Sequence, residues 1–217
     1  MPTAARAAGP DAAPPESISH AVLRLVEVSR RFDSVLAVAP LTLTLEPGAV
    51  CLVEGANGSG KTTLLRLAVG LLEPSTGQRV APVGPALYLR AGDGARGAQT
   101  VAQAVAFAAR LGTGDLDEAL CLAQLDALSG ARVERLSSGQ RARVSLAVAV
   151  AARPRLACLD EPTAHLDEGG VACAARVVER LAADGTAILV ATHDPQTLAE
   201  VADARLRFHN GLLELVT

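Results

Sequence analysis

Gly55-Ala56-Asn57-Gly58-Ser59-Gly60-Lys61-Thr62 is the stretch of sequence that decides the fold. It matches the pattern G-x-x-x-x-G-K-[ST], in which the backbone N–H groups of a glycine-rich loop surround phosphate oxygens. The apolar run from Ala49 to Val53 precedes the loop, and an apolar helical pattern from about Lys61 to Leu72 follows it. The sequence therefore predicts a buried strand, a phosphate loop and a helix whose positive end faces the anion.

The predicted phosphate loop assigns roles to individual side chains. We expect the Lys61 ammonium to contact the β- and γ-phosphates of a nucleotide, and the Thr62 hydroxyl to ligate Mg²⁺. A chance glycine-rich turn would not be flanked by an apolar strand and an apolar helix. The predicted ATP-binding residues of this segment are Gly55, Ala56, Asn57, Gly58, Ser59, Gly60, Lys61, Thr62 and Thr63.

A second motif follows about 100 residues later, where Leu156-Ala157-Cys158-Leu159 reads as a buried strand that ends at Asp160-Glu161. Asp160 is predicted to hold Mg²⁺ through water, and Glu161 to polarise the water that attacks the terminal phosphate. Phosphoryl transfer requires mainly positioning and charge neutralisation, so one lysine, one metal and one carboxylate base suffice. Acidic pairs after strands are also common as helix caps, so this motif gains its weight from the phosphate loop upstream.

The rest of the chain alternates strands and helices, which favours a mostly parallel sheet covered on both faces. The segment 91–135 contains two helical patterns, near 100–111 and 115–128, and no expected strand. Asn210-Gly211 indicates a hairpin turn. Pro74 and Gly77 are expected to end the helix that follows the phosphate loop. Further strands are predicted at 21–28, 41–45, 86–89, 187–191, 205–208 and 212–215, and further helices at 138–152 and 171–183.

Length and composition limit the function classes. A chain of 217 residues accommodates one domain, and a net charge of −3 provides no field for nonspecific nucleic-acid binding. The four cysteines lack C-x-x-C spacing, so we expect reduced core residues rather than a zinc site. No stretch approaches the roughly 20 apolar residues of a membrane span. Residues 1–20, rich in Ala and Pro, are predicted to be a disordered leader before a domain at 21–217.

Leu136-Ser137-Ser138-Gly139-Gln140 resembles the LSGGQ signature of ABC ATPases, with Ser138 in place of a glycine. The segment lies between the phosphate loop and the acidic pair, at the start of a predicted helix, as in that family. The resemblance extends from about Leu23 to Leu215. It implies an α/β P-loop NTPase fold of ABC type, with a mostly parallel sheet core, an antiparallel β part and a small helical subdomain at about 91–152.

The same resemblance assigns roles to residues outside the phosphate loop. It implies that Asp167 is the D-loop contact between subunits, that His193 is a switch histidine at the γ-phosphate, and that Phe32 stacks on adenine. With Lys61 and Glu161, His193 completes the implied catalytic set of an ATPase. A lone histidine before Asp-Pro can also be a cap, and a lone Phe is more often a core residue, so the order of the motifs carries these two assignments.

In the family, the signature segment closes the nucleotide site of a second subunit. The resemblance therefore implies a head-to-tail dimer, most simply a homodimer, with ATP and Mg²⁺ at two shared sites. It also implies an integral membrane permease as partner, no nucleic acid, and a cytoplasmic location on the inner face of the cell membrane.

One position departs from the family pattern, because Ala91 stands where a glutamine that contacts Mg²⁺ is expected. Gln99 and Gln103 are candidates to replace it, and a binding-only subunit is an alternative to an active enzyme. Ala86-Leu87-Tyr88-Leu89 and the following residues are similar to the ATP-binding subunit of the cytochrome c biogenesis haem exporter. Rivals are a small exporter of drugs, lipids or peptides, a non-transport ABC ATPase, and a small-molecule kinase that shares the phosphate loop.

Overall fold

The computed structural model describes residues 5–8, 20–80, 84–209 and 211–216. Its centre is a six-stranded sheet of order β10-β9-β4-β8-β7-β6, in which only β10 runs antiparallel to its neighbour. The predicted mostly parallel sheet is confirmed, as is the C-terminal hairpin, although Asn210 in its turn lies outside the described residues. The strands are β4 (Val50–Glu54), β6 (Ala86–Arg90), β7 (Leu156–Asp160), β8 (Ala187–Thr192), β9 (Ala204–His209) and β10 (Leu212–Leu215).

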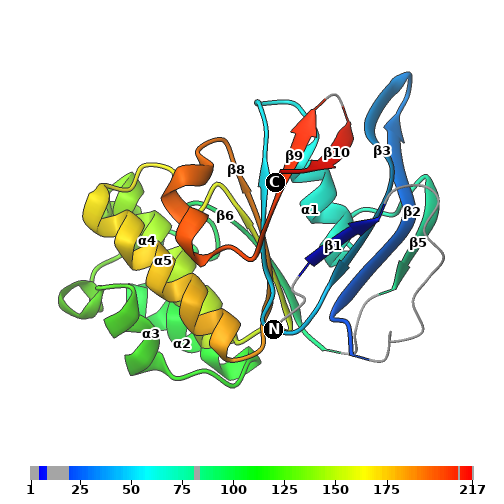
Figure 1. Cartoon of the computed structure of the whole chain (residues 1–217). Coiled ribbons are helices and arrows are strands. Elements are labelled where there is room, and N and C mark those ends of the chain that lie inside the picture. Colours follow the sequence, from blue (N-terminus) through cyan, green and yellow to red (C-terminus); the bar gives the residue numbers. More distant parts are fainter. Residues whose placement is uncertain (1–4, 9–19, 81–83, 210, 217) are drawn as a thin grey trace.

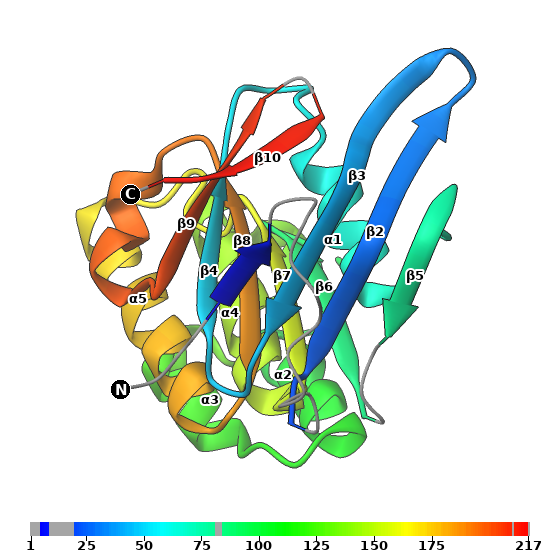
Figure 2. The same ribbon diagram turned by 45° about the vertical axis from the view of Figure 1, so that its right-hand side comes forward.

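A second, antiparallel sheet has the order β1-β3-β2-β5. Its strands are β1 (Ala5–Ala8), β2 (Leu23–Phe32), β3 (Val35–Leu45) and β5 (Thr76–Val80). Figure 2 shows β2 and β3 as a long hairpin at the side of the molecule. The sequence analysis does not predict β5, because four of its five residues are exposed and no apolar alternation marks it.

The predicted leader needs one correction. Ala5–Ala8 forms strand β1, which pairs with the edge of β3 from Leu45 to Thr42 through backbone hydrogen bonds that do not depend on side-chain pattern. Residues 1–4 and 9–19 of the predicted leader lie outside the described residues.

Helices cover both faces of the six-stranded sheet (Figure 1). α1 (Lys61–Val69) lies on the face that also meets the antiparallel sheet. The opposite face is covered by α2 (Val101–Leu111), α3 (Leu116–Leu122), α4 (Ser138–Ala152) and α5 (Glu168–Ala183). Short 3₁₀ helices occur at Asp126–Leu128, Val133–Arg135 and Pro195–Val201.

Two helices end earlier than the sequence predicts. α1 stops at Val69 because Gly70 adopts a left-handed conformation, and its N–H bonds back to the carbonyls of Arg66 and Leu67. The segment predicted as one helix from 115 to 128 divides into α3 and a 3₁₀ turn, with Gln124 at a φ of 55° between them. Cys121 on α3 is exposed, so the prediction that all four cysteines lie in the core is wrong for this residue.

The apolar core is divided by the six-stranded sheet into two clusters. On β4, Val50 and Leu52 pack toward α4 and α5, whereas Cys51 and Val53 pack toward α1 and the antiparallel sheet. Alternate residues of a strand point to opposite faces, so a strand buried on both sides reads as a continuous apolar run. This packing fixes the strands so that their carboxyl ends meet at one edge.

Four charged side chains fasten the helical layer together. Glu118 of α3 pairs with Arg153, the residue after α4, at 2.9 Å and with Arg180 of α5 at 2.7 Å. Asp184, at the end of α5, pairs with the same two arginines. All four side chains are about 25–31% exposed, and such networks hold their members more firmly than isolated surface pairs. The network therefore ties the ends of three helices to one another.

Candidate functional site

The phosphate loop occupies residues 55–60, between β4 and α1, as predicted. Ala56, Asn57 and Gly58 are exposed at its tip, and Thr63 follows in the first turn of α1. Gly60 has a φ of 116°, and a Cβ atom there would lie 2.2 Å from the carbonyl oxygen of Ala37 in β3. Gly58 also has a positive φ, 79°, but a Cβ there would meet no atom of the described residues within 4 Å. The loop is thus tightly packed at its base and open at its tip.

The N-terminus of α1 carries a partial positive charge that favours an anion. Within the described part of the chain, no side chain caps this N-terminus, and the first turn of the helix contains no acidic residue, so its free N–H groups and the positive end of the helix dipole are uncompensated. The Ser59 hydroxyl oxygen is buried and has no hydrogen-bond partner among the described residues. A buried polar atom without a partner costs free energy, and phosphate oxygens would satisfy it.

Lys61, the first residue of α1, is buried, with 6% of its surface exposed. Its ammonium donates hydrogen bonds to the carbonyl oxygens of Gly55 at 2.6 Å and Ala56 at 3.1 Å. The charged group therefore lies inside the ring of the loop, within 4.0 Å of Glu161 Oε1. In this position it is available to a phosphate bound by the loop.

The predicted metal residues lie in direct contact. Thr62 Oγ1 donates a hydrogen bond of 2.8 Å to Asp160 Oδ2, at the end of β7. Within the described ranges, no group of three or more His, Cys, Asp or Glu side chains is placed to hold a metal ion. A hydroxyl and a carboxylate nevertheless suit Mg²⁺, which prefers oxygen ligands and binds through one or two protein oxygens together with substrate phosphates.

Tyr88 of β6 is a neighbour of this pair that the sequence analysis does not single out. Its hydroxyl donates a hydrogen bond of 2.8 Å to the same Asp160 Oδ2. Burial, the hydrogen bond to Asp160 and the charge of that carboxylate together raise the pKa of the Tyr88 phenol. The phenol is therefore a hydrogen-bond donor across the physiological pH range.

Glu161 and His193 form the next part of the site. Glu161 has a φ of 54°, and its backbone N–H donates to the Ala191 carbonyl of β8 at 2.8 Å, which holds the residue at the end of the sheet. Glu161 Oε2 contacts His193 Nδ1 at 2.7 Å and accepts a hydrogen bond from the His193 N–H at 3.3 Å. The His193 side chain is 62% exposed. Glu161, after β7, thus lies between His193, after β8, and Lys61 at the end of the phosphate loop.

A buried carboxylate supports the loop from below. Glu54, the last residue of β4, contacts Arg205 at 2.9 Å and Arg207 at 2.8 Å, both on β9. Burial by itself would raise the pKa of Glu54, but the hydrogen bonds from the two arginines outweigh it and hold the pKa below its usual value. This anchor was missed from the sequence, because its members lie about 150 residues apart.

The signature segment lies apart from these residues, at the start of α4. Ser137 caps α4 and forms a reciprocal capping box with Gln140, and Leu136 is buried while Ser137 and Ser138 are exposed. Because α4 and α1 pack on opposite faces of the sheet, the signature segment belongs to a different surface from the loop at the start of α1 (Figure 1). A Cβ atom at Gly139 would lie 2.8 Å from the His165 carbonyl oxygen. The signature segment therefore packs against the backbone two residues before Asp167, the predicted D-loop residue of the same chain.

Asp167 and Phe32 also have local partners. Asp167 is exposed and caps α5, with its Oδ1 accepting a hydrogen bond of 2.8 Å from the Gly170 N–H. Phe32 ends β2 in the hairpin whose other strand lies against Gly60, and the residue is 41% exposed. The Arg30 guanidinium lies 4.6 Å from the Phe32 ring centroid, so one ring face already has a cationic neighbour.

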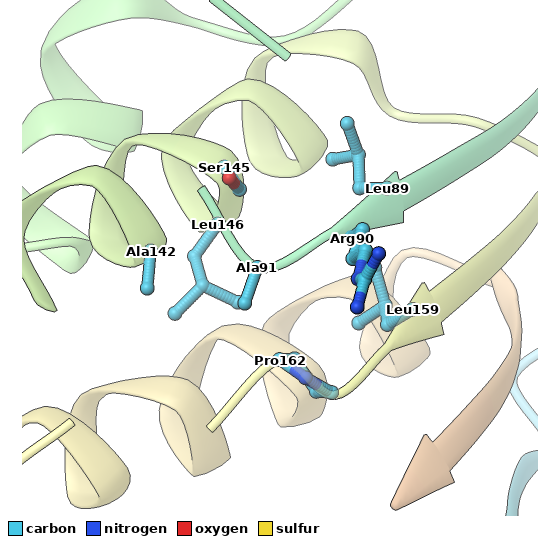
Figure 3. Close-up of a pocket in the computed structure, with 8 residues that line it drawn as sticks. All are labelled: Leu89, Arg90, Ala91, Ala142, Ser145, Leu146, Leu159 and Pro162. Carbon is cyan, nitrogen blue, oxygen red and sulfur yellow. The ribbon is translucent and has the colours of Figure 1, made fainter. Parts of the chain in front are cut away.

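Ala91 follows β6, and its N–H donates to the Asp160 carbonyl at 3.1 Å. It lines a small pocket between the ends of β6 and β7 and the α4 residues Ala142 and Ser145 (Figure 3). Gln99 and Gln103 do not replace the expected glutamine, because the side chain of each accepts a hydrogen bond from a backbone N–H close to it in sequence. Gln99 Oε1 accepts from the Arg96 N–H, and Gln103 Oε1 accepts from the N–H of Thr100, the cap of α2.

The chain matches the ABC transporter family over residues 38–164. A cytochrome c biogenesis ATP-binding export protein of Cereibacter sphaeroides is 39% identical over 168 residues, covering 76% of this chain and 80% of that protein. The zinc import ATP-binding protein of Roseobacter denitrificans is 33% identical over 190 residues, covering 83% and 74% of the two chains. A Streptomyces coelicolor protein, named as an ABC transporter ATP-binding protein, is 37% identical over 190 residues, covering 79% of this chain, which spans only 33% of that longer protein.

Among solved structures, cbiO1 of Clostridium perfringens, part of the ABC transporter complex cbiONQ, is similar with a TM-score of 0.74. Its sequence is 26% identical, and the similarity covers 90% of this chain and 88% of that one. In the part of the chain that the structure describes, no helix combines the length and apolar character needed to cross a membrane. The family match covers more than half of the chain and includes the phosphate loop, the signature segment and the acidic pair. The chain therefore belongs to the ABC transporter family and contains its ATPase domain.

Proposed function

We propose that this chain is the ATP-hydrolysing subunit of a transporter and works as a head-to-tail dimer on a separate membrane permease. The observation that carries the proposal is the meeting of Lys61, Thr62, Asp160, Glu161 and His193 at one edge of the parallel sheet. Membership of the ABC transporter family supports it, as does the likeness to cbiO1, which is part of a transporter complex. Work on a permease would place the subunit on the cytoplasmic face of the membrane.

The phosphate loop and α1 bind the triphosphate in this proposal. The Lys61 ammonium exchanges the Gly55 and Ala56 carbonyls for β- and γ-phosphate oxygens, and Ser59 gains the partner that its hydroxyl lacks. The free N–H groups at the start of α1 add their partial positive charge. Phe32, which is 41% exposed on the β2–β3 hairpin, supplies a ring for adenine.

Thr62 and Asp160 are the residues that would hold Mg²⁺, which would neutralise negative charge on the phosphates. Glu161 orients the attacking water and accepts its proton. His193 holds Oε2 of Glu161, so Oε1, on the side of Lys61, is the oxygen directed at the phosphate loop. After ATP binds, we expect His193 to contact the γ-phosphate as well, since its side chain is 62% exposed and therefore accessible to a bound nucleotide.

A second subunit completes the site. The exposed Ser137 and Ser138 start a helix on the opposite face of the sheet from α1, so they are available to the nucleotide of another chain. Asp167, exposed two residues after the His165 carbonyl that Gly139 approaches, is the proposed contact between subunits. When each subunit contributes its signature segment to the nucleotide of the other, the dimer contains two shared sites.

Haem export for cytochrome c biogenesis is the proposed transport function, supported by the 39% identity to the Cereibacter sphaeroides export protein over most of both chains. The zinc import relative favours a second candidate, metal uptake. A generic exporter of drugs, lipids or peptides is a third. Copurification of the tagged chain from native membranes, followed by mass spectrometry of the bound permease, distinguishes them. A zinc-type permease in that preparation would overturn the haem proposal.

Sedimentation of the Glu161→Gln protein tests the shared site. This variant should bind MgATP, lose turnover, and shift from monomer to dimer only when MgATP is present. Lys61→Ala is the matched control, because it removes the phosphate contact and should stay monomeric. A Glu161→Gln protein that hydrolyses ATP at the normal rate would refute the role of Glu161. A monomer under all conditions, despite ATP binding, would refute the homodimer.

A further inference from the structure

Tyr88, the only tyrosine of the chain, lies in β6 directly opposite Cys158 of β7. Leu87 and Leu89 pack into the cluster beneath α4, whereas Tyr88 and Cys158 pack into the cluster beneath α1. Asp160 follows Cys158 by two residues and therefore points to the same face. The strand register thus places the phenol of Tyr88 alongside the carboxylate at the end of β7.

The Asp160 carboxylate is held by two hydroxyl groups. Thr62 Oγ1 and the Tyr88 hydroxyl each lie 2.8 Å from Oδ2, and Asp160 is 4% exposed. Among the described residues, no other hydrogen bond to this carboxylate is present, so Oδ1 is the oxygen left for a metal-bound water. Rotation about the last bond of an aspartate is soft, and one hydrogen bond leaves it free to swing. Two donors on one oxygen restrict that rotation.

The Tyr88 ring is itself held in place. The Arg66 guanidinium lies 5.7 Å from the ring centroid, and Arg66 is one helical turn beyond Thr62 on α1. The ring is half-buried between α1 and β7. The phenol therefore has little freedom to turn away from Asp160, and its hydroxyl position is set by packing rather than by the hydrogen bond alone.

We propose that Tyr88 is a positioning residue that holds Asp160 in the orientation required for binding Mg²⁺ together with ATP. The inference rests on the proposed metal site of Thr62 and Asp160. The Thr62 hydroxyl would both ligate the metal and donate a hydrogen bond to Asp160, whereas the Tyr88 hydroxyl only donates a hydrogen bond to Asp160. Partners that orient a metal-binding side chain without touching the metal contribute strongly to metal affinity.

Tyr88→Phe tests the proposal, because it removes the hydroxyl and keeps the ring. The affinity of the protein–ATP complex for Mn²⁺, measured by electron paramagnetic resonance, should fall about 10-fold. The affinity for ATP without a divalent ion, measured with a fluorescent analogue in EDTA, should be unchanged. Thr186→Val is the matched control, since the buried Thr186 hydroxyl donates to the Pro154 carbonyl at 2.7 Å, away from the site. It removes a buried hydroxyl hydrogen bond and should leave both affinities unchanged.

Asp160→Asn separates the two levels of the proposal. If this variant binds Mn²⁺ as tightly as the parent, the metal site itself is wrong, and the role of Tyr88 falls with it. If Asp160→Asn weakens Mn²⁺ binding but Tyr88→Phe does not, only the positioning role of Tyr88 is overturned. The positioning role would also be overturned if Tyr88→Phe weakened metal-free ATP binding as much as Mn²⁺ binding, or if Thr186→Val lowered the Mn²⁺ affinity as much as Tyr88→Phe does. Either result would point to a general structural effect.

Discussion

Gly60→Ala should destabilise the fold by about 3 kcal/mol, and the structure separates the contributions. An alanine at a φ of 116° costs about 1–2 kcal/mol. The new methyl would lie 2.2 Å from the Ala37 carbonyl oxygen and 2.6 Å from the Phe208 ring, so β3 or β9 must move, and overpacking of this kind costs about 1–3 kcal/mol. Alanine also lowers the conformational entropy of the unfolded chain, which offsets roughly 0.4–1 kcal/mol of this loss of stability.

Gly58→Ala is the matched comparison, because Gly58 also has a positive φ but open space around its missing Cβ. Only the backbone cost applies there, so its destabilisation should be about 1 kcal/mol. Urea unfolding followed by far-ultraviolet circular dichroism measures both. At a slope of roughly 2 kcal/mol/M, the midpoint of Gly60→Ala should fall by about 1.5 M and that of Gly58→Ala by about 0.5 M.

Nucleotide binding adds a second readout. The methyl of Gly58→Ala would enter the open tip of the loop, so ATP affinity should fall in this variant although most of its stability remains. Equal losses of stability in the two variants would refute the steric reasoning, because the contacts of Gly60 with β3 and β9 would then contribute nothing. Full ATP affinity in Gly58→Ala would show that the phosphates lie elsewhere.

Two further predictions concern buried groups away from the phosphates. Iodoacetamide at pH 8 should label the exposed Cys121 in the native protein and leave Cys51 unmodified, as measured by peptide mass. The reason is that burial, and then the charge of Asp203, raise the pKa of the Cys51 thiol to about 12. Labelling of Cys51 under native conditions would contradict this. Glu54→Gln should lower stability by about 2 kcal/mol at pH 7, because it weakens charged hydrogen bonds from Arg205 and Arg207. The folded-state pKa of Glu54 is lowered, so its contribution is complete above the unfolded value near 4.3 and disappears as the pH falls through the folded pKa. Chemical unfolding at several pH values checks this, and a difference between the parent and Glu54→Gln that stays constant down to pH 3 would contradict it.

Much of the fold could be predicted from neighbouring residues. The phosphate loop carries its own backbone requirements, and the apolar runs before it and before Asp160 are strands buried on both faces, which the structure confirms. The alternation of strands and helices then limits the sheet to a mostly parallel arrangement. The start of α4 near Ser138 was predicted as well, and the structure shows a local cause for it, because Ser137 and Gln140 form a capping box.

The features that could not be predicted depend on contacts between distant segments. Tyr88 meets Asp160 across 72 residues, and Glu54 meets Arg207 across 153, so no window of sequence contains both partners. Strand β5 is held by pairing with β2 rather than by an apolar face, so it leaves no periodic signal. Gly70 could have been recognised as the end of α1, because glycine is the usual residue for a left-handed helix terminus.

The depth at which α4 is buried bears on the thermodynamics of association. Nine of its 15 residues are buried, and its first turn is fixed by the capping box and by the close approach of Gly139 to the His165 carbonyl. The segment that would meet a second subunit is thus already ordered in the isolated chain. Ordering of loops on binding normally subtracts from affinity. In the proposed dimer, the signature segment therefore loses little conformational entropy on association. The effect of ATP on dimer affinity should then come mainly from the phosphate loop and the residues around it.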